Sequence, residues 1–163
     1  MDEEQYHKLY HELNPDRCVF EKSITNCRCD CELKQHFLIA TREGIACRSK
    51  TALKNCTLLL NTMRNRSRFA LKVVTVDGSV AHNKELRIQV GGLLGLQNLT
   101  QPDSLTDSSA DLQNSKTVFN IRKIVQASME KYGNIEDIAY SDIIKYITAY
   151  KVRQKSHSKS RRR

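Results

Sequence analysis

All six cysteines lie between residues 18 and 56, and none follows Cys56. Their spacing is C-x8-C-x-C-x-C-x15-C-x8-C. Thiolates bind zinc and iron-sulfur clusters because the soft sulfur shares charge with the metal, and four of them complete either kind of site. The pattern therefore predicts a thiolate-ligated metal centre whose candidate ligands are Cys18, Cys27, Cys29, Cys31, Cys47 and Cys56.

The spacing favours an iron-sulfur cluster, of the 4Fe-4S type, over zinc. Zinc domains usually present C-x2-C or C-x4-C pairs, which this chain lacks, so zinc remains the alternative. A cluster takes ligands from separate elements, which suits the isolated Cys18, Cys47 and Cys56. Within the trio we favour Cys31, because a helix expected to begin there would aim amide dipoles at its thiolate. Plain core thiols, a copper-type cluster and redox sensing stay open.

The rest of the chain predicts a mostly α fold with a C-terminal helical pair and room for one short hairpin. The 163 residues can bury a real core, and two prolines and six glycines favour helices over a many-turned β fold. The apolar runs at 57–60 and 90–96 are too short to span a bilayer. An acidic N-terminus without a signal pattern predicts a cytoplasmic protein with reduced cysteines.

The expected elements follow from local periodicity. Helices are predicted over 2–12 and 32–42, and a third is capped by Ser49 or Thr51 and carries an apolar stripe from Leu53 through Met63 to Phe69. A short hairpin is expected around Asp77-Gly78. Residues 83–96 are ambiguous between helix and strand, and their glycines would allow another backbone to approach closely.

Composition divides the chain into four parts. Residues 1–97 form a cysteine-rich metal-binding helical region, and the polar stretch 98–115 is a predicted flexible linker. Residues 116–151 form a helical hairpin, with helices over 118–132 and 135–150 joined at Gly133-Asn134. Residues 152–163 are a basic, disordered tail. We expect Lys155 to Arg163 to bind polyanions in a salt-dependent way or to dock on a larger assembly.

Three segments carry a resemblance to a known family. They are the stretch from Cys18 to Cys56, RSRFALKV at 66–73 and ELRIQVGGLLGLQ at 85–97. Together they resemble small bacterial cysteine-rich proteins labelled as prismane-type iron-sulfur cluster proteins. The resemblance implies a cluster bound by Cys18, Cys31, Cys47 and Cys56.

Two functions from different classes are consistent with these features. The first is an iron-sulfur protein that transfers electrons to a protein redox partner or senses redox state. The second is a zinc-stabilised module that docks on nucleic acid or a larger assembly through its basic tail. No thiol-enzyme, hydrolase or kinase signature is present, so we predict no catalytic residue. His7 and His11 read as helix surface, and His36 is a weaker candidate ligand.

Overall fold

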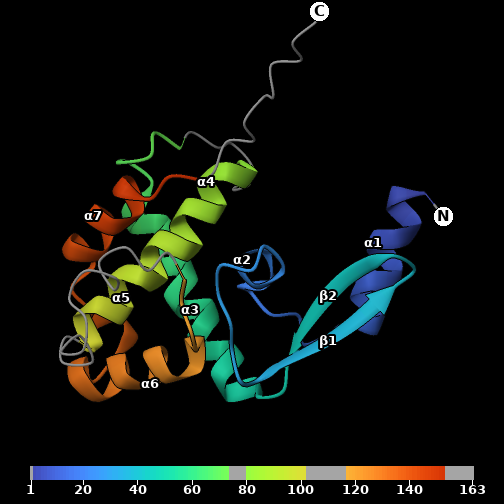
Figure 1. Cartoon of the computed structure of the whole chain (residues 1–163), viewed down its shortest axis with the longest axis horizontal. Coiled ribbons are helices and arrows are strands. Elements are labelled where there is room, and N and C mark those ends of the chain that lie inside the picture. The colour runs from blue at the N-terminus through green and yellow to red at the C-terminus, as the bar shows by residue number, and fades with distance from the viewer. Residues whose placement is uncertain (1, 74–79, 102–116, 153–163) are drawn as a thin grey trace, which may run out of the picture.

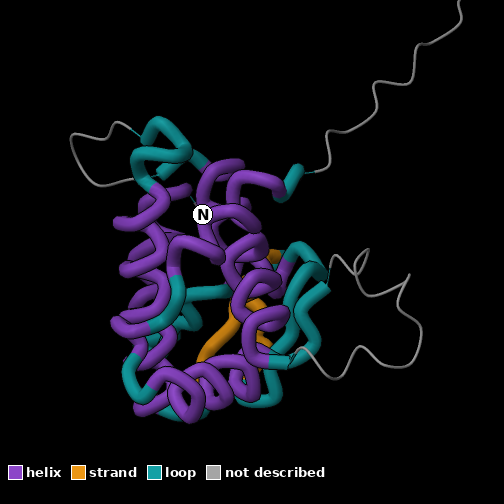
Figure 2. The backbone as a smooth tube through the Cα atoms, turned by 90° about the vertical axis from the view of Figure 1, so that its left-hand side faces the viewer, coloured by secondary structure: helices purple, strands orange, loops and turns teal. Residues whose placement is uncertain are grey.

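The computed structural model describes residues 2–73, 80–101 and 117–152. Helices make up most of this part, and one two-stranded antiparallel sheet accompanies them (Figures 1 and 2). In the described residues, no helix is both long and apolar enough to cross a membrane. The hairpin expected at Asp77-Gly78, most of the predicted linker and the basic tail from residue 153 lie outside the described residues.

Helix α1 (Glu3–Leu13) confirms the first predicted helix. Asp2 caps it through a capping box with Gln5, and Asn14 follows its last turn. Tyr10 turns inward and is buried, whereas Leu13, expected on the same apolar side, is 60% exposed. The short helix α2 (Glu21–Thr25) follows and lies between α1 and the other helices (Figure 1).

The helix predicted over 32–42 is wrong, because these residues form the first strand of a hairpin. Strand β1 (Lys34–Ile39) pairs antiparallel with β2 (Arg42–Cys47), and Ala40 adopts a φ of 55° in the turn. Phe37 lies opposite Gly44, where a Cβ atom would stand 2.4 Å from Phe37 Cζ. Pairing with a sequence-adjacent strand thus overrides the near-helical spacing of the apolar residues.

Helix α3 (Lys50–Ser67) is the longest element and begins where the sequence indicates. Ser49 Oγ accepts a hydrogen bond from the Ala52 N–H at 3.2 Å, which satisfies one free amide of the first turn. The middle of the predicted stripe is buried, including Leu59 and Leu60. Phe69, placed in the same stripe by periodicity, follows the helix and is 97% exposed, so that assignment is wrong.

The ambiguous segment 83–96 is helical. It comprises α4 (His82–Leu86), a π-helical turn η1 (Arg87–Gly91) and α5 (Gly92–Thr100), which extends past the expected boundary at residue 97. A Cβ atom on Gly91 would lie 2.8 Å from Ile147 Cα. The predicted close approach of another backbone at this glycine is confirmed.

The C-terminal pair differs from the predicted helical hairpin. Helix α6 (Ile121–Tyr132) ends at Gly133, whose φ is 83°, and a 3-10 turn η3 (Ile135–Asp137) precedes α7 (Tyr140–Ala149). Both helices pack chiefly against α5 rather than against each other. The single helix expected over 135–150 is thus shortened by the 3-10 turn, and α6 and α7 do not form the expected packed pair.

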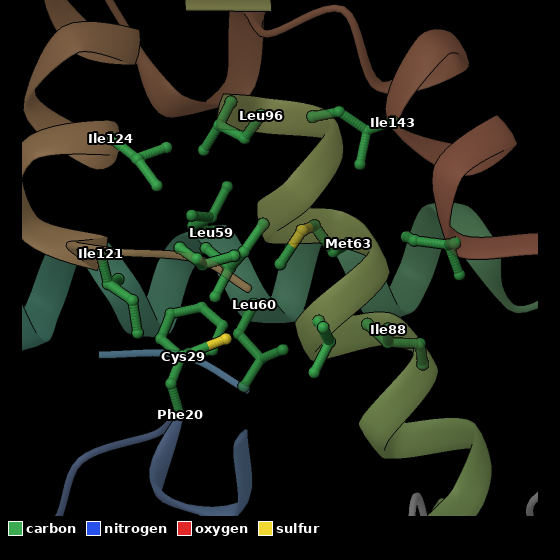
Figure 3. Packing of buried hydrophobic residues seen from close by; sticks show 14 of the residues in the cluster. Phe20, Cys29, Leu59, Leu60, Met63, Ile88, Leu96, Ile121, Ile124 and Ile143 are labelled. Carbon is green, nitrogen blue, oxygen red and sulfur yellow. The ribbon is translucent and has the colours of Figure 1, made fainter. Parts of the chain in front are cut away.

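The apolar core lies among these helices, and the N-terminal segment reaches into it. Phe20 and Cys29 extend towards the helical core beside Leu60 and Ile121 (Figure 3). The α1 helix and the β1–β2 hairpin lie together at the opposite end of the molecule (Figure 1). The cysteine-bearing segments therefore occupy the junction between the hairpin and the helices.

Candidate metal centre

Four of the six thiols line one small cavity at this junction. Its volume is about 20 Å³, and its other walls are mainly apolar side chains, with Arg122 at one side. The four are Cys18, Cys31, Cys47 and Cys56. The fold thus brings together the same four cysteines that the sequence and its family resemblance single out.

Backbone pairing places Cys18 beside Cys47. The Cys18 N–H donates to the Ile45 carbonyl at 3.0 Å, and the Cys47 N–H donates to the Asp16 carbonyl at 2.9 Å. Arg17 forms an antiparallel bridge with Ala46 between these bonds. Residues 16–18 therefore run along the end of β2 like a short third strand.

Cys31 is held by a helix that begins some ninety residues later. The Arg122 N–H, in the first turn of α6, hydrogen-bonds to the Cys31 thiol, as does the Leu33 N–H. The junction is fixed by the Ile121 N–H, which donates to the Asp30 carbonyl at 2.9 Å, and by a parallel bridge between Cys29 and Val118. Our expectation that a helix begins at Cys31 is wrong, because β1 follows it; the amide dipole comes from α6 instead.

Cys56 completes the group from the second turn of α3. Helix α3 starts three residues after Cys47, whose thiol donates to the Ser49 carbonyl at 3.3 Å. The direct continuation of β2 into α3 carries Cys56 over the cavity. Cys56 follows the apolar spacing of α3 because it also packs against the hydrophobic core.

The remaining two cysteines do not line the cavity. Cys27 is exposed and has a φ of 56° in the turn after α2. Cys29 is 4% exposed, belongs to the hydrophobic core and interacts with the Ser23 hydroxyl. All six cysteines are free thiols in the structure. The fold therefore places two of the six candidate ligands, Cys27 and Cys29, outside the shared cavity.

The environment of Cys18, Cys31 and Cys56 disfavours bare thiolates. The pKa of Cys18 is raised to about 12, mainly by burial and to a smaller extent by the neighbouring Cys31 and Cys47. Burial also raises the pKa of Cys56, where the other three thiols act in the same direction. The pKa of Cys31 is raised by burial as well. A metal that binds here would have to displace protons, which makes its uptake pH-dependent.

The shared cavity is not by itself a metal-binding geometry. Within residues 2–73, 80–101 and 117–152, no group of three or more His, Cys, Asp or Glu side chains is arranged to hold a metal ion. Lining one cavity demands less than ligation, because four sulfurs around zinc must approach to about 3.8 Å of one another. The donor set is chemically suited to a thiophilic metal, but in the described residues the four thiols are not arranged to ligate one.

No sequence motif points to two polar residues near this site, Asn120 and Arg122. Asn120 precedes α6 at the usual N-cap position, yet its side chain makes no cap bond and accepts instead from the Glu32 N–H at 3.4 Å. Arg122 pairs with Glu32 at 2.7 Å and lies beside the thiols. Neither could be assigned from local sequence, because each acts on a segment about ninety residues away.

The histidines of the described residues lie outside the cavity. His7 pairs with Glu3 on the exposed face of α1, in agreement with a surface role. His36 faces Glu43 across the hairpin, with 2.7 Å between Nδ1 and Oε1. His36, the weaker candidate ligand, is thus turned to a carboxylate on the exposed side of the sheet.

Comparisons of the chain with protein-family models, curated proteins and solved structures find no match. The resemblance to prismane-type proteins therefore stays a prediction from the sequence. The functional assignment has to be built from the geometry of the site.

Proposed function

We propose that the protein binds a 4Fe-4S cluster through Cys18, Cys31, Cys47 and Cys56 and works in electron transfer or redox sensing. The observation that carries the proposal is the convergence of these four thiols, from four separate segments, on one largely apolar cavity. Such a cluster supplies reversible one-electron chemistry when bound. Its electrons would be exchanged with a protein redox partner.

The distribution of the ligands supports a cluster over a single ion. Cys18 precedes α2, Cys31 precedes β1, Cys47 ends β2 and Cys56 lies within α3. A cubane is bound at its corners, so its ligands can approach from different elements and remain farther apart than around one ion. Zinc sites instead usually begin with closely spaced cysteine pairs.

Amide donors around the cavity suit a negatively charged group. The Phe20 N–H hydrogen-bonds to the Cys18 thiol, and the Leu33 and Arg122 N–H groups do so at Cys31. Helix α6 has no acidic residue in its first turn and no side-chain cap, and the Arg122 N–H of this turn places its positive end beside Cys31. Amide hydrogen bonds to sulfur stabilise thiolate ligation and tune the reduction potential of a cluster.

The size of the cavity favours a second candidate, a structural zinc site. A volume of about 20 Å³ accommodates about one water-sized sphere, so a cluster requires more displacement of side chains than zinc does. In that case the protein is a zinc-stabilised binding module, and the basic tail is its contact with nucleic acid or a larger assembly.

Metal and sulfide analysis of the full chain separates the candidates. Protein purified without oxygen should contain iron and acid-labile sulfide in equal amounts and absorb broadly near 400 nm. Exposure to air should bleach that absorption while the chain remains in solution. One equivalent of zinc without sulfide in the anaerobic preparation would replace the cluster proposal by the zinc module.

A further inference from the structure

We propose that a second, charged cavity beside the thiol site binds a small anion with a carboxylate or phosphate group. This charged cavity has a volume of about 450 Å³ and lies between α2, α3 and the α4–η1 segment. That volume is within the range of small-molecule sites. Its polar lining comprises Arg17, Glu21, Lys22, Arg64, Glu85 and Gln89.

Both carboxylates of the charged cavity are occupied by internal donors. Glu85 is 3% exposed and accepts from Arg64 Nε at 3.1 Å and from Gln89 Nε2 at 2.9 Å. Glu21 accepts from the Ile45 N–H at 3.2 Å, from the Tyr10 hydroxyl and from Arg17. Neither carboxylate is therefore free to bind a cation.

The cationic side chains keep donors to spare. Among the ion pairs of the described residues, none includes Lys22. Arg17 uses one guanidinium nitrogen on Glu21 and stacks over Tyr10. Each arginine offsets one carboxylate, so Lys22 leaves the charged cavity with one net positive charge. An oxyanion is the complementary ligand.

A buried hydrogen-bond network supports the polar wall of the charged cavity. Gln89 is 2% exposed, and its amide bonds to Ser23, Val19 and Glu85. It lies in η1, where the chain is wound as a π-helix, a form that is rare and often found at functional sites. A buried network of this kind holds its charged members in place before a ligand arrives.

The charged cavity also borders the candidate metal centre. Cys18 lines both cavities, so an anion held by Lys22 would stand next to the Cys18 corner of a cluster. Only this contact rests on the proposed function. The anion site itself depends on side chains that are present whether or not metal is bound.

NMR titration of the full chain with sodium phosphate, and separately with sodium acetate, tests the site. At constant ionic strength set by sodium chloride, saturable shifts are expected for the Lys22 amide and the Gln89 side-chain amide with at least one of the two anions. Replacing Lys22 by glutamine should weaken that affinity about tenfold, because one charge-assisted hydrogen bond is lost. Lys8→Gln, an exposed position on α1, is the matched control and should leave affinity unchanged.

The pattern of response decides the result. Saturation with phosphate alone assigns a phosphate ligand, and saturation with acetate assigns a carboxylate. Shifts that chloride reproduces, or equal affinity in wild type and Lys22→Gln with native spectra, would overturn the anion site. Iron and sulfide content is measured separately, so loss of the cluster proposal and loss of the anion site are distinguishable.

Discussion

The two ends of the molecule are stabilised by different means. In the helical end, α3, α5, α6 and α7 bury an apolar core in which Leu93, Leu96, Ile143 and Ile147 are fully enclosed. In the cysteine end, residues 16–48, backbone pairing, ion pairs and four half-buried thiols add to a smaller set of buried apolar side chains such as Phe20 and Ile45. Hydrophobic burial is the main source of stability in the helical end, whereas under the proposed function we expect ligation of the thiols to add stability to the cysteine end.

Metal removal should have the largest effect, and only on one end. If the proposed cluster is bound, stripping its iron should loosen the segments that carry Cys18, Cys31 and Cys47, because the metal–sulfur bonds that join them are lost. Hydrogen-exchange mass spectrometry should show protection in residues 16–48 falling by at least about a hundredfold, with α5 and α7 unchanged. Equal loss of protection in both ends would show that the fold is a single metal-dependent unit.

A core truncation should instead destabilise the helical end, and it should do so independently of metal. Leu96→Ala removes a fully buried side chain from α5 and should lower the free energy of unfolding by about 3 kcal/mol. Urea denaturation followed by circular dichroism measures the loss in loaded and metal-free protein. Leu58→Ala, on the exposed face of α3, serves as the control and should cost much less. If the loss of unfolding free energy in Leu96→Ala depended on metal content, the two ends would not be stabilised independently.

Because α7 packs closely on the η1–α5 segment, enlarging a glycine there should destabilise the protein by a smaller amount, and two glycines can be compared. Gly91→Ala forces a Cβ atom against the α7 backbone and should destabilise the protein by about 2 kcal/mol. At Gly95 the nearest atoms belong to the Tyr146 side chain, which can rotate, so Gly95→Ala should cost less. Thermal unfolding of both variants ranks them, and the reverse order would show that α7 shifts more easily than Tyr146.

The smallest expected effect concerns alkaline pH and the cysteine end. Burial and its hydrogen bond to Glu21 raise the pKa of Tyr10 to about 12. The folded state thus holds this proton more tightly than the unfolded chain, whose tyrosine has a pKa of about 10. Its stabilisation is complete below pH 10 and is lost as pH rises through 12. Tyr10→Phe should cost about 1 kcal/mol at pH 7 and flatten the decline in stability between these values. An unchanged slope would show that Tyr10 does not titrate in this range.

The sequence predicts several of the helices and the four thiols of the cavity, but not how they come together. Ser49 and the stripe through Leu59 are local signals, and the structure agrees with them. Phe37 follows the helical period but lies in a strand, because strand pairing depends on residues that periodicity does not weigh. The sequence favours Cys31 because of an adjacent helix, yet the helix whose amide bonds to its thiol is α6, through Arg122. Contacts between residues about ninety positions apart cannot be predicted from the local spacing of residue types.

Iron and sulfide content in a series of single serine variants tests the central claim most directly. Cys18→Ser, Cys31→Ser, Cys47→Ser and Cys56→Ser are compared with Cys27→Ser, which changes an exposed thiol outside the cavity. We predict about four iron and four sulfide per chain in wild type and Cys27→Ser, and a marked loss in each of the other four. Full cluster content in any of those four, or its loss in Cys27→Ser, would contradict the proposed ligand set.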